Sequence, residues 1–380
     1  MCWRKPRGCS VNDIILDARM IRHSGIGTYV RGLLKGFQSH PFFSVRSFAL
    51  ATGPSLFPDC NGATRKVAFH SPIYSVWEQA EYPLRMNACR LWHAPHYNIP
   101  LIKGKARLVV TIHDLIHWIF QKEFYSSVHA VYSRFFFARL ADQADKIIAV
   151  SQRTRDDLIH HFRVPEEKIR VIYEGVSEDF FQNPDLKARN DFLLKNNLPH
   201  EFFLYVGLMK PHKNVNRLLR VFRKLRSEGK VRLPLVMVGK KDKKYPKGQE
   251  LTEGLATGGG IFYLPQVSSQ TELACLYSSA KALIHPSLYE GFGLTCLEAM
   301  ASGTPLAVSR VASLPEVVGE AGHYFDPYSD DSLGSALIAM EENENLRTQW
   351  GQKGRERARQ FQWKKTAEET IEVYREVLGS

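Results

Sequence analysis

Short apolar runs of strand length alternate with longer runs of helical period along most of the 380-residue chain. In the first half, this pattern predicts helices at residues 28–37 and 135–144 and strands at residues 14–16, 107–112, 146–150 and 170–173. Strands that alternate with helices are typical of α/β domains with parallel sheets. We therefore predict a first doubly wound domain over residues 1–180.

The alternation restarts after a polar segment at residues 177–200, which is rich in asparagine and contains two prolines, and which we interpret as a linker region. Beyond it, the pattern predicts a helix at residues 215–225 and strands at residues 202–206, 235–238, 261–264, 282–285 and 306–309. These elements predict a second doubly wound domain over residues 198–362. Two such domains are expected to hold a ligand in a central cleft, at the carboxyl ends of their strands.

The amino-acid composition limits the classes of protein to which the chain can belong. A hydrophobic content of 44% is sufficient for two cores, and no apolar stretch approaches the roughly 18 residues of a membrane span. The basic N-terminus lacks the apolar region of a secretion signal, and the six cysteines form no CxxC pair. We expect a cytoplasmic protein.

The net charge of +12 favours an anionic partner. The candidates are a phosphorylated substrate, an anionic membrane leaflet and nucleic acid. Basic residues are dispersed, with a modest cluster at residues 240–247. Nucleic acid is the weakest of the three because the chain has no zinc finger, RNP signature or basic heptad region. We therefore predict no nucleic-acid partner, and peripheral contact with an anionic membrane remains compatible with the charge.

The segment HPSLYEGFGLTCLEAMASGTP at residues 285–305 carries the strongest chemical signal. A strand ends, glycines follow, and a helix begins, so the free amides of Gly293, Leu294 and Thr295 point outward at a helix N-terminus that attracts phosphate. Glu290 precedes this site, and Glu298 lies one turn inside the helix, where a carboxylate can accept hydrogen bonds from a ribose diol. Phosphate flanked by sugar hydroxyls describes a sugar nucleotide.

The same spacing has a purely structural alternative. Thr295 and Glu298 stand three residues apart, as in a capping box whose glutamate satisfies an amide at the helix start. Glu290 would then be an ordinary loop carboxylate. Spacing alone leaves both interpretations open.

Cations follow the first strand of the second domain, in the segment VGLMKPHKN at residues 206–214. Lys210, His212 and Lys213 lie on a strand-to-helix loop, where they can reach a diphosphate, and Asn214 is a good N-cap residue for the helix that follows. Solvated surface lysines are the alternative.

In the first domain, Gly25 and Gly27 precede a helix whose N-terminal amides can also face an anion. Their spacing from the strand does not fit a dinucleotide fingerprint, so we reject a nicotinamide cofactor. His113 ends a strand, where it can contact a sugar hydroxyl, although a partly buried structural histidine is equally compatible with the pattern. Zinc binding by His113 and His117 is a poor alternative because no third ligand is evident.

Assembled in order, these motifs resemble the retaining glycosyltransferases of family four, which share the GT-B fold. The resemblance spans nearly the whole chain. It runs through DARMIRHSGIGTYVRGLL, LWHAPHYNIP, VVTIHDL, ADKIIAVSQRTRDDLI, KIRVIYEGV, VGLMKPHKN, the glutamate-spaced segment above, SLPEVVGEAG and QFQWKKTAEETIEVY.

The resemblance implies a role for each matching residue. Glu290 would hold the donor sugar, Glu298 the ribose, and Lys213 the leaving diphosphate, while His113 would touch the donor sugar from the other domain. The backbone amides of Phe292, Gly293 and Leu294 would serve the sugar and the diphosphate, and Gly25 and Gly27 would border the diphosphate. The final helix, from about residue 363 to 380, would cross back onto the first domain.

One departure from the family concerns the second cation on the diphosphate. Many relatives have an arginine directly after the glycine that matches Gly207, where this chain has Leu208, and others have an arginine where His212 stands. Lys210 is the substitute that we predict.

The implied function is transfer of a hexose with retention from a nucleotide diphosphate sugar to a glycan or lipid-linked acceptor. The HDL and PHKN motifs look most like bacterial mannosyltransferases that use GDP-mannose for surface polysaccharide or lipopolysaccharide. The chain contains no DxD sequence, so no obligatory metal or other cofactor is expected. A UDP-sugar donor and a noncatalytic sugar-nucleotide-binding protein are the alternatives.

Overall fold

The computed structural model describes residues 12–379, apart from residues 39, 45, 54–64, 122, 124–126 and 241–258. Most of the predicted basic cluster at residues 240–247 therefore lies outside the described residues. The chain divides into two compact units. Unit 1 takes the described residues of Met1–Trp118, Ser127–Tyr173 and Trp363–Ser380, and unit 2 takes those of Ile119–Ser126 and Glu174–Gln362.

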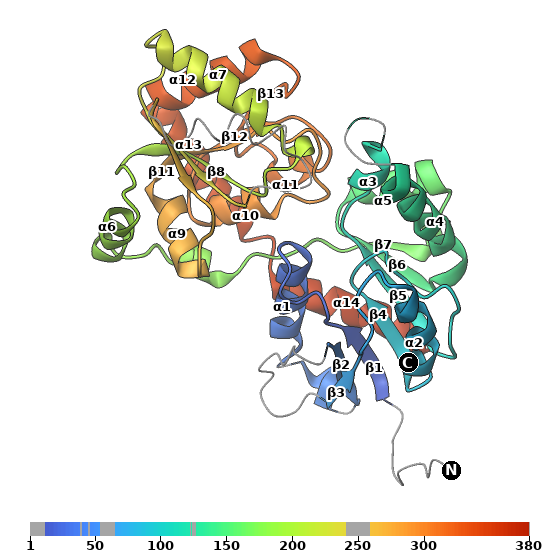
Figure 1. The fold of residues 1–380 in the computed structure, drawn as a ribbon. Coiled ribbons are helices and arrows are strands. Elements are labelled where there is room, and N and C mark those ends of the chain that lie inside the picture. The colour runs from blue at the N-terminus through green and yellow to red at the C-terminus, as the bar shows by residue number, and fades with distance from the viewer. Residues whose placement is uncertain are drawn as a thin grey trace. The chain divides into compact units, whose positions relative to one another are not determined.

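Unit 1 is built on a parallel sheet with the strand order β3-β2-β1-β4-β5-β6-β7 (Figure 1). Its strands are β1 (Asn12–Asp17), β2 (Phe48–Thr52), β3 (Arg65–Ala68), β4 (Cys89–Ala94), β5 (Arg107–Ile112), β6 (Lys146–Ala149) and β7 (Ile169–Val171). The register places Leu16 of β1 between Leu50 of β2 and His93 of β4. The central strands are buried on both faces, as expected of a parallel sheet covered by helices.

The helices of unit 1 connect these strands and cover the sheet. They are α1 (Ile26–Phe37), α2 (Val76–Met86), α4 (Ser127–Gln143), α5 (Gln152–Phe162) and α14 (Trp363–Leu378), with 3-10 turns η1 (Pro41–Ser44) and η2 (Glu166–Lys168). The short α3 (Ile116–Ile119) spans the border between the units. The predicted helix at residues 28–37 begins two residues earlier, at Ile26.

Unit 2 has a second parallel sheet, whose described strands lie in the order β10-β9-β8-β11-β12-β13. They are β8 (Phe202–Val206), β9 (Leu235–Val238), β10 (Ile261–Leu264), β11 (Ala280–His285), β12 (Leu306–Ser309) and β13 (His323–Phe325). The described helices are α6 (Leu186–Lys195), α7 (Val215–Ser227), α9 (Gln270–Ser279), α10 (Leu294–Ala301), α11 (Leu314–Val318), α12 (Asp330–Glu342) and α13 (Glu344–Ala358), with turns η3 (Glu178–Phe181) and η4 (Pro211–Lys213). The expectation of two doubly wound parallel-sheet domains is confirmed.

The polar segment at residues 177–200 is not the irregular linker that we predicted. It contains η3 and α6, and Asp185 caps α6 by accepting a hydrogen bond from the Ala188 amide at 2.6 Å. Phe180, Phe192 and Leu193 are buried, and Arg189 donates to the carbonyl of Ser278 in α9. A few apolar side chains among many polar ones were therefore enough to dock this segment on unit 2.

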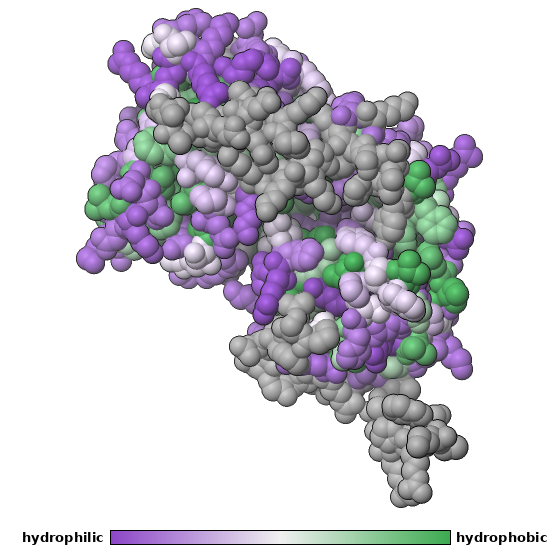
Figure 2. Space-filling view, viewed as in Figure 1, coloured by the Kyte–Doolittle hydropathy of each residue, from purple (hydrophilic) through white to green (hydrophobic). Residues whose placement is uncertain are grey.

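The surface is polar over some elements and apolar over others. Figure 2 shows hydrophilic residues over α7 and α12, and a group of hydrophobic residues over α4. On α4, the side chains of Val131 and Phe135 are 67% and 41% exposed. No helix in the described part of the chain is long and apolar enough to cross a membrane.

Candidate active site

The carboxylate of Glu290 is the centre of a buried polar cluster in unit 2. Its Oε1 atom accepts hydrogen bonds from Lys213 Nζ at 2.6 Å, from Ser287 Oγ at 2.6 Å and from His285 Nε2 at 2.8 Å. Its Oε2 atom has no hydrogen-bond partner among the described residues. One oxygen therefore anchors the side chain, and the other is available to a ligand.

The sheet explains why these residues meet. Lys213 follows β8, and Glu290 follows β11, and these two strands are parallel neighbours. Loops at the carboxyl ends of neighbouring parallel strands emerge at the same edge of the sheet. The Leu288 amide donates to the His212 carbonyl at 2.7 Å, which ties the two loops together.

The backbone around Glu290 is also fixed from the other side. Ser313, which is buried and precedes α11, donates its hydroxyl hydrogen toward the carbonyls of Glu290 at 2.9 Å and Phe292 at 3.0 Å. The loop is thus fixed through the side chain of Glu290 and through the carbonyls of Glu290 and Phe292. This holds the Glu290 carboxylate in one orientation.

The surroundings of Glu290 keep it ionised. Burial acts to raise its pKa, but the charge of Lys213 and the hydrogen bond from His285 outweigh burial and hold the pKa well below its ordinary value. Glu290 is thus an anion at neutral pH and a weak base. Such a group stabilises positive charge that develops beside it.

The start of α10 carries amides without a side-chain cap. Its N-cap residue is Gly293, with a φ of +104° that favours glycine, and a Cβ atom there would lie 2.9 Å from Leu314. The amides of Gly293, Leu294 and Thr295 have no acceptor among the described residues. They are therefore available to an anion at the positive end of the helix dipole.

The capping-box alternative for Glu298 is wrong. Its carboxylate accepts a hydrogen bond from the Tyr277 hydroxyl at 3.0 Å instead of capping α10. Burial raises the pKa of Glu298 to about 7, partly offset by the hydrogen bond from Tyr277 and reinforced by the negative charge of Glu174. Glu298 and Glu290 therefore have opposite titration behaviour although both belong to one motif.

The remaining cations of the β8 loop lie in different surroundings. Lys210 is half-buried, and its side chain has no partner among the described residues, whereas His212 is buried. The prediction that the side chain of Asn214 caps α7 is wrong. Asn214 adopts a left-handed conformation, and its Nδ2 donates to the Pro327 carbonyl at 2.9 Å.

The candidate residues of unit 1 lie at the carboxyl edge of its sheet. Gly25 is the N-cap of α1 and has no side-chain cap, and Gly27 lies in the first turn of that helix. His113 follows β5, and its Nε2 donates to the Pro95 carbonyl at 3.1 Å. The ring of Tyr29 in α1 packs edge-on against His113 at 4.9 Å between centroids, so α1 and the end of β5 are in contact.

Several polar residues of these sites were not predicted. His285 and Ser287 lie within the quoted motif, and their position directly after an apolar strand was a usable signal. Tyr277 on α9 was not recognisable, because its partner Glu298 is 21 residues away on another helix.

Comparisons with known proteins agree with this geometry. Residues 23–180 match the family described as Glycosyltransferase Family 4, and residues 187–357 match the family described as Glycosyl transferases group 1. The chain is 31% identical over 287 residues to O-antigen chain mannosyltransferase B of Escherichia coli, covering 75% of this chain and 74% of that protein. It is 28% identical over 301 residues to O-antigen chain mannosyltransferase RfbU of Salmonella typhimurium, covering 79% of each.

A solved structure of similar fold is sucrose-phosphate synthase from Thermosynechococcus elongatus. The TM-score is 0.77 at 21% sequence identity, and the match covers 97% of this chain and 99% of that chain. Three findings agree. They are the two parallel-sheet, Rossmann-like units, the two matching family descriptions and the similarity to these relatives. The chain belongs to the family 4 glycosyltransferases and has the GT-B fold.

Proposed function

We propose that this glycosyltransferase moves mannose from GDP-mannose, with retention of anomeric configuration, to a glycan or lipid-linked saccharide in the synthesis of a surface polysaccharide or lipopolysaccharide. The mannosyl specificity is supported by the names of the relatives from Escherichia coli and Salmonella typhimurium. The observation that carries the proposal is the ionised Glu290, anchored by Lys213 close in sequence to the uncapped start of α10.

The chemistry of the reaction matches these charges. Breaking the bond between the anomeric carbon and diphosphate leaves positive charge on the sugar and negative charge on phosphate. Lys213 and the amides of Gly293 and Leu294 are suited to the phosphate, with Lys210 as the second cation. The Oε2 atom of Glu290 is suited to the sugar, and Glu298 to the ribose diol.

In this proposal, the acceptor oxygen attacks on the face from which diphosphate leaves, and a diphosphate oxygen takes its proton. Glu290 is not the nucleophile, because three hydrogen bonds on Oε1 hold it in place and make it a weak base. We assign His113 a contact with the donor sugar, and Gly25 and Gly27 contacts with the diphosphate, as the family resemblance implies. No obligatory metal is needed, so activity is expected to persist in EDTA.

The proposal is tested with a thermal-shift panel of GDP-mannose, GDP, UDP-glucose and UDP, followed by product analysis. Stabilisation by the guanosine ligands supports the mannosyl donor, whereas stabilisation only by the uridine ligands identifies a UDP-sugar enzyme. Donor binding without any product would favour the noncatalytic alternative. If no nucleotide stabilises the protein, the proposed function is wrong.

Variants test the assigned roles. Glu290→Gln and Lys213→Ala are expected to lower kcat on the order of a hundredfold or more, because each removes charge stabilisation made in the transition state. Glu320→Gln and Lys224→Ala change exposed groups of the same types in unit 2 and should retain full activity. Full activity in the first pair would refute the site, and an inverted product, by NMR of the new linkage, would refute retention.

A further inference from the structure

The Oε1 atom of Glu290 has more hydrogen-bond donors around it than one carboxylate oxygen can accept well. Lys213 Nζ, Ser287 Oγ and His285 Nε2 all lie within 2.8 Å of it. An ionised carboxylate oxygen has about two lone-pair directions, so three donors compete for them. The Ser287 and His285 donors are themselves only 3.2 Å apart. One of the three can therefore leave without making Oε1 a buried acceptor that lacks a donor.

Lys213 is the donor best able to leave. Ser287 and His285 are 0% and 1% exposed, and both belong to the same segment as Glu290. The Lys213 side chain is 19% exposed, and it comes from the separate loop after β8 on a flexible four-carbon stem. Its backbone amide donates to the Lys210 carbonyl at 3.0 Å, so the loop is held and only the side chain has to turn.

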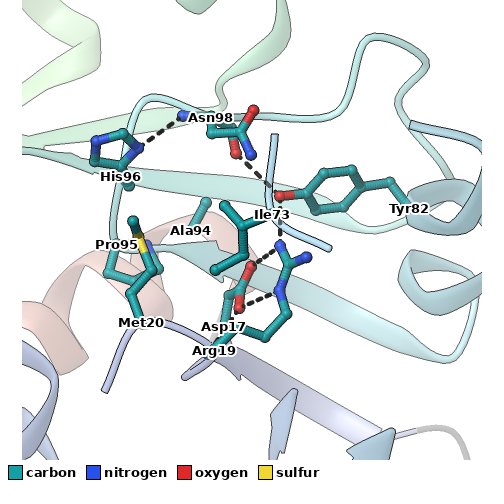
Figure 3. A pocket seen from close by; sticks show the side chains of 9 residues that line it. All are labelled: Asp17, Arg19, Met20, Ile73, Tyr82, Ala94, Pro95, His96 and Asn98. Carbon is teal, nitrogen blue, oxygen red and sulfur yellow. Dashed lines mark hydrogen bonds and ion pairs between the residues drawn. The ribbon is translucent and has the colours of Figure 1, made fainter. Parts of the chain in front are cut away.

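A buried cation of unit 1 illustrates the opposite case. The Arg19 side chain is 4% exposed, and its guanidinium donates to Asp17 at 2.8 Å and to the Tyr82 hydroxyl at 2.8 Å (Figure 3). It is also paired with the carboxylate of Glu78 at 2.8 Å. Two buried carboxylates already compensate this single charge, and they repel any further anion. Lys213 has one carboxylate partner among the described residues and is open to solvent, so an arriving anion can compete for it.

The start of α10 is the place to which Lys213 can turn. The carbonyls of Glu290 and Phe292 both accept from the one hydroxyl of Ser313, so the chain between Glu290 and Gly293 makes a tight turn. The uncapped amides at Gly293 therefore follow directly on the carboxylate that holds Lys213. A diphosphate at these amides carries more negative charge than one carboxylate does, and it attracts the ammonium more strongly.

His285 is the donor that can hold Glu290 once Lys213 has turned away. It ends β11, and its carbonyl accepts a hydrogen bond from Ser309 Oγ of β12 at 3.2 Å, so two strands fix its position. Its Nδ1 atom is buried and has no hydrogen-bond partner in the described part of the chain. A hydrogen on Nδ1 would be unpaired, so the tautomer that we assign carries it on Nε2, from which it is donated to Glu290.

We propose that Lys213 passes from Glu290 to the diphosphate when the donor binds, and that His285 is the positioning residue that then keeps the Glu290 carboxylate in place for the sugar. After transfer, Lys213 returns to Glu290, and this return weakens the binding of the nucleoside diphosphate product. The inference rests on the proposed function, because it concerns the same nucleotide-sugar site. It makes Glu290 a competitor of the diphosphate as well as the carboxylate that faces the sugar.

The first test measures the affinity of the full chain for GDP by calorimetry. Glu290→Gln should bind GDP about tenfold more tightly than the parent, although its kcat is lower, because a neutral amide no longer competes for Lys213. GMP, which lacks the β-phosphate, should gain less affinity than GDP. Unchanged or weaker GDP binding by Glu290→Gln would overturn the exchange.

A double-mutant cycle separates exchange of Lys213 from simple repulsion between Glu290 and the diphosphate. Lys213→Ala should bind GDP about tenfold more weakly than the parent. Adding Glu290→Gln to Lys213→Ala should then bring no gain, because no lysine is left to release. If Glu290→Gln improved GDP binding equally with and without Lys213, repulsion alone would explain the effect and the exchange would be wrong.

The role of His285 is tested by removing its hydrogen bond and keeping a ring. In His285→Phe, Glu290 should hold Lys213 more strongly, so the affinity for GDP should fall severalfold and kcat about tenfold. Adding Glu290→Gln should restore tight GDP binding, which it would not do if His285→Phe had merely damaged the fold. His285→Gln keeps a donor and should bind GDP as the parent does.

Two further variants complete the test. Ser287→Ala removes the other buried donor with little change of volume, and it should shift GDP affinity in the same direction as His285→Phe. His323→Phe is the matched control, because His323 of β13 is half-buried and packs against the ring of Trp350. It should leave GDP affinity and kcat unchanged.

Parent-like GDP affinity in both His285→Phe and Ser287→Ala would overturn the positioning role. If only uridine nucleotides bind the parent, UDP and UMP replace GDP and GMP in every arm with the same expectations. Failure of every nucleotide to bind the parent would instead count against the proposed function.

Discussion

The two glutamates of the α10 motif illustrate how residue-scale surroundings give identical side chains different chemistry. Glu290 has a depressed pKa because Lys213 and His285 outweigh its burial, whereas burial raises the pKa of Glu298 to about 7. A depressed carboxyl pKa stabilises the folded state above the unfolded value near 4.5, and this contribution is lost as the pH falls through the folded value. A raised carboxyl pKa has the opposite effect, so Glu298 opposes folding increasingly between about pH 4.5 and 7.

We therefore expect opposite pH dependence from two matched variants. Relative to the parent, Glu298→Gln should gain stability at pH 8 but not at pH 4.5, by about 1–2 kcal/mol after discounting for partial exposure, or a few degrees in Tm. Glu290→Gln should lose stability at pH 8 and lose less in acid. Thermal melts of the ligand-free proteins from about pH 3 to pH 8 measure both, because the contribution of Glu290 is lost only below about pH 4.5. The same pH dependence in both variants would contradict the assigned pKa directions.

At the scale of elements, the packing of α14 on α1 completes unit 1. Trp363 is buried at the start of α14, and its ring approaches Gly32 so closely that a Cβ atom there would lie 2.1 Å from Cδ2. Thr366 of α14 also donates to the Tyr173 carbonyl at 2.8 Å. This C-terminal helix is therefore part of the core of unit 1.

Trp363→Ala is expected to destabilise unit 1 by about 3–5 kcal/mol, because it removes a large buried ring. Hydrogen exchange of amides in β1 and β4 should accelerate by two orders of magnitude or more, while β8 and β11 of unit 2 keep their protection. Trp350→Ala is the matched control, since Trp350 packs against the core of unit 2. If Trp363→Ala accelerated exchange equally in both units, the assignment of α14 to unit 1 alone would be wrong.

The elements that sequence patterns predict best are those whose burial is most continuous. β5, β8 and β11 were predicted within two residues because each is a run of apolar side chains. β2, β3 and β4 were not predicted. β3 begins with the charged Arg65 and Lys66, and β4 includes the polar Arg90 and His93, so neither is a continuous apolar run. α6 was not predicted because most of its residues are polar, and only a few of its side chains are buried against unit 2.

The same distinction applies to the candidate site. Glu290 and Lys213 were recognised from local motifs, but their contact spans 77 residues and depends on β8 and β11 being neighbours. Strand order is decided by the packing of whole elements, which local periodicity does not report. The hydrogen bond between Tyr277 and Glu298 and the group around Arg19 depend on it in the same way.

At the scale of the whole molecule, the charge of +12 and the exposed apolar side chains of α4 suit peripheral contact with an anionic membrane. Val131 and Phe135 lie one helical turn apart, and the exposed Arg134 lies between them. This arrangement would bring a lipid-linked acceptor near unit 1.

We expect the protein to float with vesicles that contain anionic phospholipid, and to dissociate as salt increases. Phe135→Glu should weaken this association severalfold, because it replaces apolar contact with like charge at an anionic surface. Leu194→Glu makes the same change at a 66% exposed position on α6 of unit 2 and should have little effect. Equal binding to neutral vesicles, or equal losses in both variants, would contradict a membrane contact through α4.

The route of the chain between the units has a consequence for how the protein is made. Unit 2 is inserted into unit 1, because the chain leaves unit 1 after Tyr173 and returns at Trp363, and the Val176 amide donates to the Phe361 carbonyl at 3.1 Å near both crossings. On the ribosome, unit 2 therefore has all of its residues before unit 1 has its last helix. The surface of α1 that receives Trp363 stays uncovered until α14 has been synthesised, so unit 1, whose first strands are made before unit 2, can fold completely only after unit 2 has been made.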